Sequence, residues 1–109
     1  FQGKIEVDQI AQKTDGYQMS QALLLSPDAE MDIKPELQIF ADDVKCSHGA
    51  TIGALDEEQV FYLRSRGIPE ADARQILIRA FLEEALEPVT HDASKALFED
   101  ALASWWGRQ

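Results

Sequence analysis

The chain has 109 residues, 45% hydrophobic and 28% charged, and its 20 acidic against 10 basic side chains give a net charge of −10. The length corresponds to a single domain, and the composition is that of a chain that can fold. The acidity argues against binding to nucleic acid and against docking on an anionic membrane, because both need clustered basic residues. No apolar run approaches the roughly 20 residues of a membrane-spanning helix.

The N-terminus bears on whether the sequence is part of a longer protein, and the single cysteine bears on its redox compartment. The first residues, Phe1 to Lys4, have no initiator Met and none of the features of a signal peptide, and an alternating run follows at once. We therefore interpret the sequence as a fragment of a longer protein. One cysteine, Cys46, cannot form an internal disulfide and suits a reducing compartment, so we expect a cytoplasmic protein.

Residues 1–54 are predicted to form short strands. Their apolar residues recur with the period of two that is typical of half-buried strands: Ile5/Val7, Met31/Ile33, Leu37/Ile39 and Val44/Cys46. Turn-like segments separate them at residues 13–16, 26–28, 34–36 and 41–43. Because no helical segment lies between these strands, the pattern fits a meander, part of a sandwich or a β-solenoid.

Residues 55–109 are predicted to form an α-helical domain of two to three helices, because the apolar period changes to 3.6 after Gly53. Asp56 followed by Gln59 resembles a capping box, and Gly67 ends that first helix. Pro69 suits the first turn of a second helix, which runs to about Leu86. Thr90 or Asp92 caps a third helix, with His91 at its start. The predicted order is therefore β then α.

Two residues form the one local group with chemical potential. Cys46 and His48 lie two apart on a predicted strand, so their side chains project to the same face, about 6.5–7 Å apart. A thiolate and an imidazole so placed suit iron or zinc, although two ligands do not complete a site. The alternatives are that Cys46 is a small packing residue, or that the pair is a Cys–His nucleophile.

The helical half carries candidate docking residues. The second helix has a wide apolar surface that includes Ile78, Phe81 and Leu82, and Trp105-Trp106 could anchor a partner. Arg64 and Arg66 could bind an anionic partner, or serve only the electrostatics of a helix end. The chain has no P-loop, Gly-x-Ser-x-Gly or His-Glu-x-x-His motif, so we expect no enzymatic activity of these kinds.

Several ordered motifs resemble the SufB/SufD family of iron–sulfur cluster assembly proteins. They are residues 39–53 (IFADDVKCSHGATIG) and 60–68 (VFYLRSRGI), with residues 13–16 (KTDG), 23–25 (LLL) and 29–37 (AEMDIKPEL) in the same order. Together they cover about residues 1–86, and the KCSHGA form resembles the SufD branch. The resemblance implies that residues 1–54 are the last rungs of a right-handed parallel β-helix (a solenoid), followed by the helical domain at residues 55–109.

The resemblance also implies partners and roles. The chain would be a non-enzymatic scaffold that binds a SufB-type paralogue through its last strands and a SufC-type ATPase through its helices. The SufC-binding residues would be Phe61, Tyr62, Arg64, Arg66, Ile78, Phe81 and Leu82. Cys46 and His48 would lie at the contact with the SufB-type chain, which would supply further ligands. The fragment itself would hold no cofactor stably, a nascent Fe–S cluster belonging to the full complex.

Two alternatives to the scaffold stay open. One is a stand-alone metal-binding or Cys/His-dependent domain, and the other makes Cys46 and His48 packing residues of a dimer interface. A truncated stack of strands presents unpaired backbone groups, so the isolated fragment is also expected to self-associate, as a homodimer for example.

Overall fold

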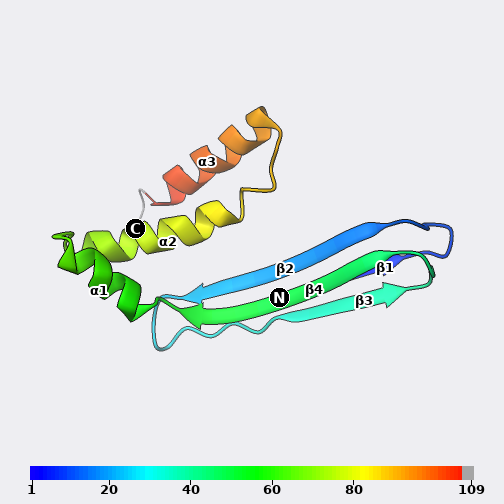
Figure 1. The fold of residues 1–109 in the computed structure, drawn as a ribbon, viewed down its shortest axis with the longest axis horizontal. Coiled ribbons are helices and arrows are strands. Elements are labelled where there is room, and N and C mark those ends of the chain that lie inside the picture. The colour runs from blue at the N-terminus through cyan, green and yellow to red at the C-terminus, as the bar shows by residue number, and fades with distance from the viewer. Residues whose placement is uncertain (107–109) are drawn as a thin grey trace. The chain divides into compact units, whose positions relative to one another are not determined.

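The computed structural model describes residues 1–106, which form four strands and then three helices (Figure 1). The elements are β1 (Gln2–Val7), β2 (Asp15–Leu24), β3 (Lys34–Ile39), β4 (Lys45–Ala54), α1 (Glu57–Ser65), α2 (Glu70–Glu84) and α3 (Asp92–Trp106). The chain divides into two compact units, one of residues Phe1–Leu55 and one that starts at Asp56. The first unit contains the strands and the second contains the helices.

The four strands form two parallel hydrogen-bonded pairs, and the two strands of a pair are separated in the sequence by a strand of the other pair. β1 pairs with β3 from Gln2↔Lys34 to Val7↔Ile39, and β2 pairs with β4 from Asp15↔Lys45 to Leu24↔Ala54. Parallel neighbours need a long crossover, and here each crossover contains a strand of the other sheet. β2 and β4 run in the same direction in Figure 1.

The expected right-handed parallel β-helix is not what the structure shows, and this prediction is corrected. The first unit consists of two separate two-stranded sheets, β1-β3 and β2-β4. A solenoid is built from at least three stacked repeats that bury a continuous core. Two pairs of strands provide a single stacking step, so the described residues do not form a solenoid.

The strand boundaries also differ from the sequence prediction. Residues 13–16 were predicted as a turn, but β2 begins at Asp15, and only Lys13, with φ of +69°, has turn-like backbone. Met31 and Ile33 were predicted on a strand and lie outside all four strands. β2 and β4 have 10 residues each, because their regular pairing continues across residues that do not alternate in hydrophobicity.

Polar side chains cover the outward side of the β1-β3 pair. Nζ of Lys4 donates to Gln38 at 2.6 Å, and Nε2 of Gln2 donates to Glu36 at 3.2 Å. Lys34 forms an ion pair with Glu36 at 2.8 Å. The hydrogen bonds from Lys34 and Gln2 lower the pKa of Glu36, since both stabilise the charged carboxylate. The opposite side carries Val7, which is only 3% exposed.

Both ends of α1 are as predicted. The Asp56 carboxylate accepts a hydrogen bond from the backbone N–H of Glu58 at 2.8 Å, which identifies it as the N-cap. At the other end Gly67 has φ of +90°, and its N–H donates to the carbonyl of Arg64 at 2.9 Å. Glycine enters this left-handed region without the steric cost that a Cβ brings, so it ends the helix there.

The other helices begin close to the predicted residues. Pro69 directly precedes α2. α3 starts at Asp92, and His91 supports its first turn: its Nδ1 accepts from the N–H of Ser94 at 3.3 Å and its carbonyl from Lys95 at 2.9 Å. Among residues 1–106 no helix is long and apolar enough to cross a membrane.

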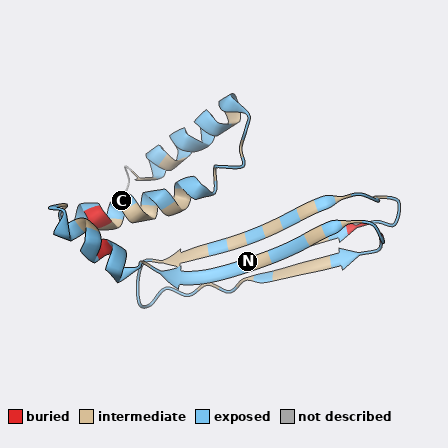
Figure 2. Cartoon of the chain, viewed as in Figure 1, coloured by how far each residue is buried: buried red, intermediate tan, exposed pale blue. Residues whose placement is uncertain are grey.

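An arginine joins α1 to α2. The Arg74 guanidinium contacts both carboxylate oxygens of Glu57, at 3.0 and 2.9 Å, and donates to Glu70 at 3.3 Å. These hydrogen bonds, first that of Glu57, raise the pKa of Arg74. Val60 on α1 and Ala73 on α2 are the buried residues of these helices (Figure 2), so the two helices share a small apolar contact.

Gly67→Ala should lower the free energy of unfolding by about 1 kcal/mol, because alanine at φ of +90° is strained although nothing lies within 4 Å of its Cβ. Gly53→Ala is the matched control, since Gly53 also has open space and its φ is not positive. Denaturant unfolding followed by far-UV circular dichroism measures both. Equal stability of the two variants would contradict the proposed role of Gly67.

Candidate functional site

The candidate site lies on one face of β4. Val44 precedes the strand, and Cys46 and His48 follow on the same side, because residues two apart on a strand project to the same face. In the parallel pairing Gly16 of β2 is the partner of Cys46, and Gln18 is the partner of His48. The structure therefore places the two predicted residues on a common face, in line with Gly16 and Gln18.

The Cys46 thiol is half-buried, and the absence of a side chain at Gly16 creates its surroundings. An atom at the missing Cβ of Gly16 would lie 3.6 Å from Sγ of Cys46 and 3.8 Å from Cγ2 of Ile5. Ile5 belongs to β1, so this face of the β2-β4 pair is directed at the other sheet. The Cys46 thiol and the Ile5 side chain thus both border the space that the missing side chain of Gly16 leaves open.

His48 is exposed on that face, and a different set of side chains occupies the opposite face. There the missing Cβ of Gly49 would lie 3.0 Å from Cε of Met19 and 3.9 Å from Oη of Tyr17. Tyr17 and Met19 are 64% and 45% exposed. Ser47 alternates with Cys46 and His48 and therefore lies on the Tyr17 side.

The chemistry available to this pair is that of a thiolate and an imidazole, the ligands that suit iron, zinc and copper. In the part of the chain that the structure describes, no group of three or more His, Cys, Asp or Glu side chains is placed to hold a metal ion. A closed iron–sulfur or zinc site usually has four ligands. Cys46 and His48 can therefore contribute two ligands to a site whose remaining ligands come from elsewhere.

The predicted docking residues divide into two groups. On α1, Phe61 and Tyr62 are 70% and 56% exposed, and the Arg66 guanidinium lies 5.0 Å from the centre of the Tyr62 ring. Arg64 forms an ion pair with Glu70 at 3.2 Å. On α2, the residues are half-buried: Ile78, Phe81 and Leu82. Of the two groups, only the one on α1 and its C-cap Arg66 forms an exposed surface, made of two aromatic residues and two arginines.

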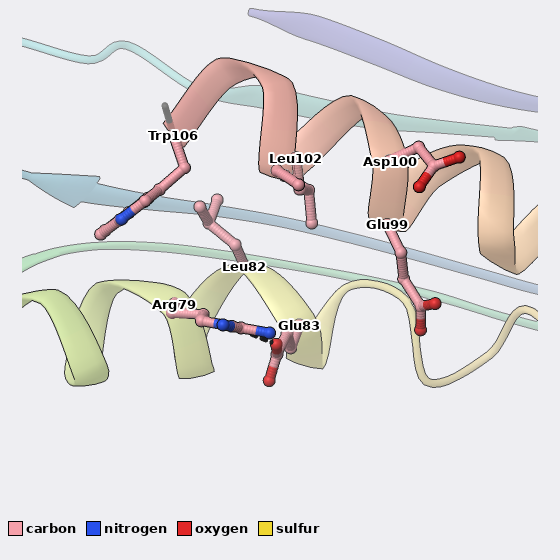
Figure 3. Close-up of a pocket in the computed structure, with 8 residues that line it drawn as sticks. Arg79, Leu82, Glu83, Glu99, Asp100, Leu102 and Trp106 are labelled. Carbon is pink, nitrogen blue, oxygen red and sulfur yellow. Dashed lines mark hydrogen bonds and ion pairs between the residues drawn. The ribbon is translucent and has the colours of Figure 1, made fainter. Parts of the chain in front are cut away.

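A cleft of about 570 Å³ lies between α2 and α3, which the sequence did not predict. In Figure 3, Leu82 of α2 and Leu102 and Trp106 of α3 project toward one another. Carboxylates edge this cleft at Glu83, Glu99 and Asp100, and Arg79 pairs with Glu83 at 2.7 Å. Trp106 is half-buried there, while Trp105 is 38% exposed, with ring centres 5.9 Å apart.

Gln18 and Gly16 are the site residues that sequence analysis missed. The assignment of residues 13–16 to a turn hid the start of β2, and therefore the strand that pairs with Cys46 and His48. The signal that could have found them is the alternation of Tyr17, Met19 and Gln21 with smaller or polar residues. Such alternation is weak when neither set is strongly apolar.

Comparison with known proteins finds one matching family model and several similar proteins, which agree with one another. The family model described as "SUF system FeS cluster assembly, SufBD core domain" matches residues 1–81. The iron–sulfur cluster assembly protein SufD of Escherichia coli is 54% identical over 95 residues, 87% of this chain and 22% of the relative. An iron–sulfur cluster assembly SufBD family protein of Synechocystis is 54% identical over 89 residues (82% and 20%). A chloroplastic protein of Arabidopsis thaliana is 51% identical over 87 residues (80% and 18%).

The chain spans about a fifth of the length of these relatives. The segment that the family model matches includes every strand of the first unit, α1 and most of α2. The candidate site on β4 therefore lies within the matched residues.

Gly16→Ala should slow alkylation of Cys46 several-fold, because the new methyl group fills the gap in van der Waals contact with Sγ. Gly49→Ala is the control on the opposite face, where the methyl group meets the flexible end of Met19. The measurement is the rate of thiol modification in the folded protein. An unchanged rate in Gly16→Ala would show that the thiol is approached from another side.

Proposed function

Because the chain belongs to the SufBD core family of the SUF iron–sulfur cluster assembly system, we propose that it is part of a SufD-like scaffold on which clusters are assembled. The proposed scaffold role is non-enzymatic: the chain binds and orients the nascent cluster, which is its cargo. The observation that carries this proposal is the pair Cys46 and His48 on one face of β4, inside the matched segment. A reducing compartment such as the cytoplasm suits a half-buried free thiol.

The cluster site is proposed to be shared with a SufB-type paralogue. Cys46 and His48 supply two ligands on β4, and the partner chain supplies the others. β4 is bonded to β2 on one side, and among the described strands no neighbour pairs with its other side. Such an edge offers backbone N–H and C=O groups to a strand of another chain, beside the exposed His48. In the absence of the partner the same edge supports a homodimer.

A SufC-type ATPase is proposed as the second partner, at the aromatic and arginine surface of α1. Aromatic residues and arginine are the side chains most often found at the energetic centre of protein interfaces. Phe61 and Tyr62 are exposed, and Arg66 stacks on the Tyr62 ring, which holds the pair in place. In this proposal the half-buried Ile78, Phe81 and Leu82 of α2 also contribute to binding the ATPase. ATP hydrolysis belongs to the partner.

His48→Ala should sharply lower the iron and sulfide bound per complex, because it removes an imidazole that the partner's ligands cannot replace. The protein is reconstituted with its SufB-type and SufC-type partners under anaerobic conditions, and iron and sulfide are counted. Ser47→Ala is the matched control, since Ser47 is the exposed neighbour on the opposite face. Cys46→Ser tests the second ligand in the same way.

Iron and sulfide counts that stay at the wild-type level in His48→Ala would refute the shared site. Iron bound by the chain without any partner, and lost in His48→Ala, would instead favour a stand-alone metal-binding domain.

Phe61→Asp should weaken binding of the SufC-type ATPase about tenfold or more, since losing ~1.4 kcal/mol at an interface centre is a factor of ten. Leu97→Asp on α3 is the matched control, because Leu97 is 69% exposed and Phe61 is 70% exposed. Calorimetric titration with the ATPase measures both affinities. An equal loss for both variants, or none for Phe61→Asp, would place the docking surface elsewhere.

A further inference from the structure

The cleft between α2 and α3 has no part in the proposed function, and one face of each helix forms its walls. The residues of α3 that line this cleft or a neighbouring hollow of about 610 Å³ are Lys95, Glu99, Asp100, Leu102, Ala103 and Trp106. Most of them recur at the three- and four-residue spacing of one helical face, and they extend over roughly 16 Å at 1.5 Å per residue. On α2 the lining residues extend from Arg79 to Glu84. The cleft is therefore a groove that follows the two helices.

Apolar side chains meet inside the cleft and are incompletely covered. Leu82 projects toward Leu102 and Trp106 (Figure 3), and all three are half-buried. Among the described residues of α3 none is buried, so α2 covers the apolar side chains of α3 only in part. The cleft volume of about 570 Å³ lies in the usual range of ligand-binding clefts, roughly 300–1,000 Å³. The space can therefore receive bulky apolar side chains of a ligand.

The rim of the cleft is strongly acidic. The cleft and the neighbouring hollow share Glu83 and Glu99. Together they are lined by five carboxylates, Glu83, Glu84, Glu87, Glu99 and Asp100, and by two basic side chains, Arg79 and Lys95. Arg79 is paired with Glu83, and within residues 1–106 no ion pair neutralises Glu84, Glu99 or Asp100. The rim thus keeps an excess of negative charge.

This negative charge acts from both helices on the space between them. The pKa of Arg79 on α2 is raised first by its hydrogen bond to Glu83 and by the charge of Glu83, and further by the charge of Glu99 on α3. Both carboxylates stabilise the charged guanidinium. A cationic side chain of a ligand placed at this rim would be stabilised in the same way.

We propose that the cleft between α2 and α3 binds a basic amphipathic helix of another protein. The apolar face of that helix enters between Leu82, Leu102 and Trp106, and its flanking Lys or Arg side chains pair with the carboxylates of the rim. Amphipathic helices bind apolar grooves in this way, with anchors three or four residues apart. The bound helix would cover the apolar side chains that α2 leaves partly exposed on α3.

Charge argues against the other occupants of such a groove. A second copy of this chain is unfavourable, because each of the three helices has more acidic than basic side chains and the whole chain has a net charge of −10. Anionic membranes and nucleic acids are repelled for the same reason. Among the described residues no group of three or more potential ligands is placed to hold a metal ion. A basic partner with an apolar face is the chemistry that fits both walls and rim.

The probe for this site is a synthetic peptide of about 18 residues, long enough to form a helix, in which leucines form one face and lysines flank it. One control peptide has glutamate in place of each lysine, and a second has glutamine in place of each leucine. Fluorescence anisotropy of the labelled peptides, titrated with the 109-residue chain, gives the affinities. The leucine and lysine peptide should bind at least tenfold more tightly than either control. Equal affinity for the glutamine peptide would overturn the proposal, because charge alone would then be recognised.

Glu99→Lys should weaken binding of the leucine and lysine peptide roughly fivefold, because an attractive exposed ion pair is replaced by a repulsive contact. Glu99 is itself exposed, so the substitution leaves the packing of α3 intact. Glu30→Lys is the matched control, since it makes the same change of charge at an exposed carboxylate of the first unit. It should leave the affinity within about twofold. An equal loss in both variants would overturn the proposal, because only the net charge of the chain would then matter.

Trp106 reports whether the peptide enters the cleft. In Trp105→Phe the remaining tryptophan is Trp106, and the peptide should shift its emission to shorter wavelength because binding removes the indole from water. Leu102→Asn should weaken binding about tenfold, with far-UV circular dichroism to check that the helices are retained. Unchanged Trp106 emission at saturating peptide would contradict the proposal.

The remaining outcomes separate this site from the proposed function and from other occupants. Phe61→Asp, which is expected to impair docking of the ATPase on α1, should leave the peptide affinity unchanged. Loss of peptide binding in Phe61→Asp but not in Glu99→Lys would move the site to α1. Displacement of the peptide by an equal concentration of spermine, or a homodimer that dissociates in Leu102→Asn, would also overturn the proposal. The occupant would then be a small cation or a second copy of the chain.

Discussion

The parallel register of β2 and β4 is the constraint on which the candidate site depends. It sets Gly16 beside Cys46 and Gln18 beside His48, joining residues 30 positions apart in the sequence. A shift of one residue would turn every side chain to the other face and place Tyr17 and Met19 against the sulfur and the imidazole. The turn preceding β2 helps to hold the register, since the N–H of Lys13 donates to the Asp43 carbonyl at 2.6 Å and Lys13 also forms an ion pair with Asp43.

The parts of the fold that local chemistry determines were predictable from the sequence. Asp56 caps a helix because its carboxylate satisfies an N–H of the first turn, and Gly67 ends the helix because only glycine enters its φ at low cost. Neither depends on distant residues. The third helix begins close to the predicted residue, and His91 has the capping role that was predicted for Thr90 or Asp92.

The strands were harder to predict than the helix ends, because strand pairing depends on residues that lie far apart in the sequence. Met31 and Ile33 alternate as a strand would, yet none of the strands that the structure describes pairs with them. Asp15 and Gly16 have the composition of a turn, but pairing with β4 draws them into a strand. This dependence on pairing also explains why only part of the candidate site was predicted from the sequence. The period of two placed Cys46 and His48 on one face, whereas Gln18 and Gly16 enter through register, which the local sequence does not specify.

The small apolar interior connects the fold to the proposed binding of partners. Among residues 1–106 the buried hydrophobic side chains are Val7, Ala41, Val60 and Ala73, while Phe61, Leu97 and Ile10 are more than two-thirds exposed. Because stability follows buried apolar area, such units have little margin by themselves. A partner that covers exposed apolar side chains stabilises the bound form by mass action, so assembly and folding stability are linked. The exposed apolar side chains that leave the isolated chain with little stability are thus those that would make the proposed association favourable.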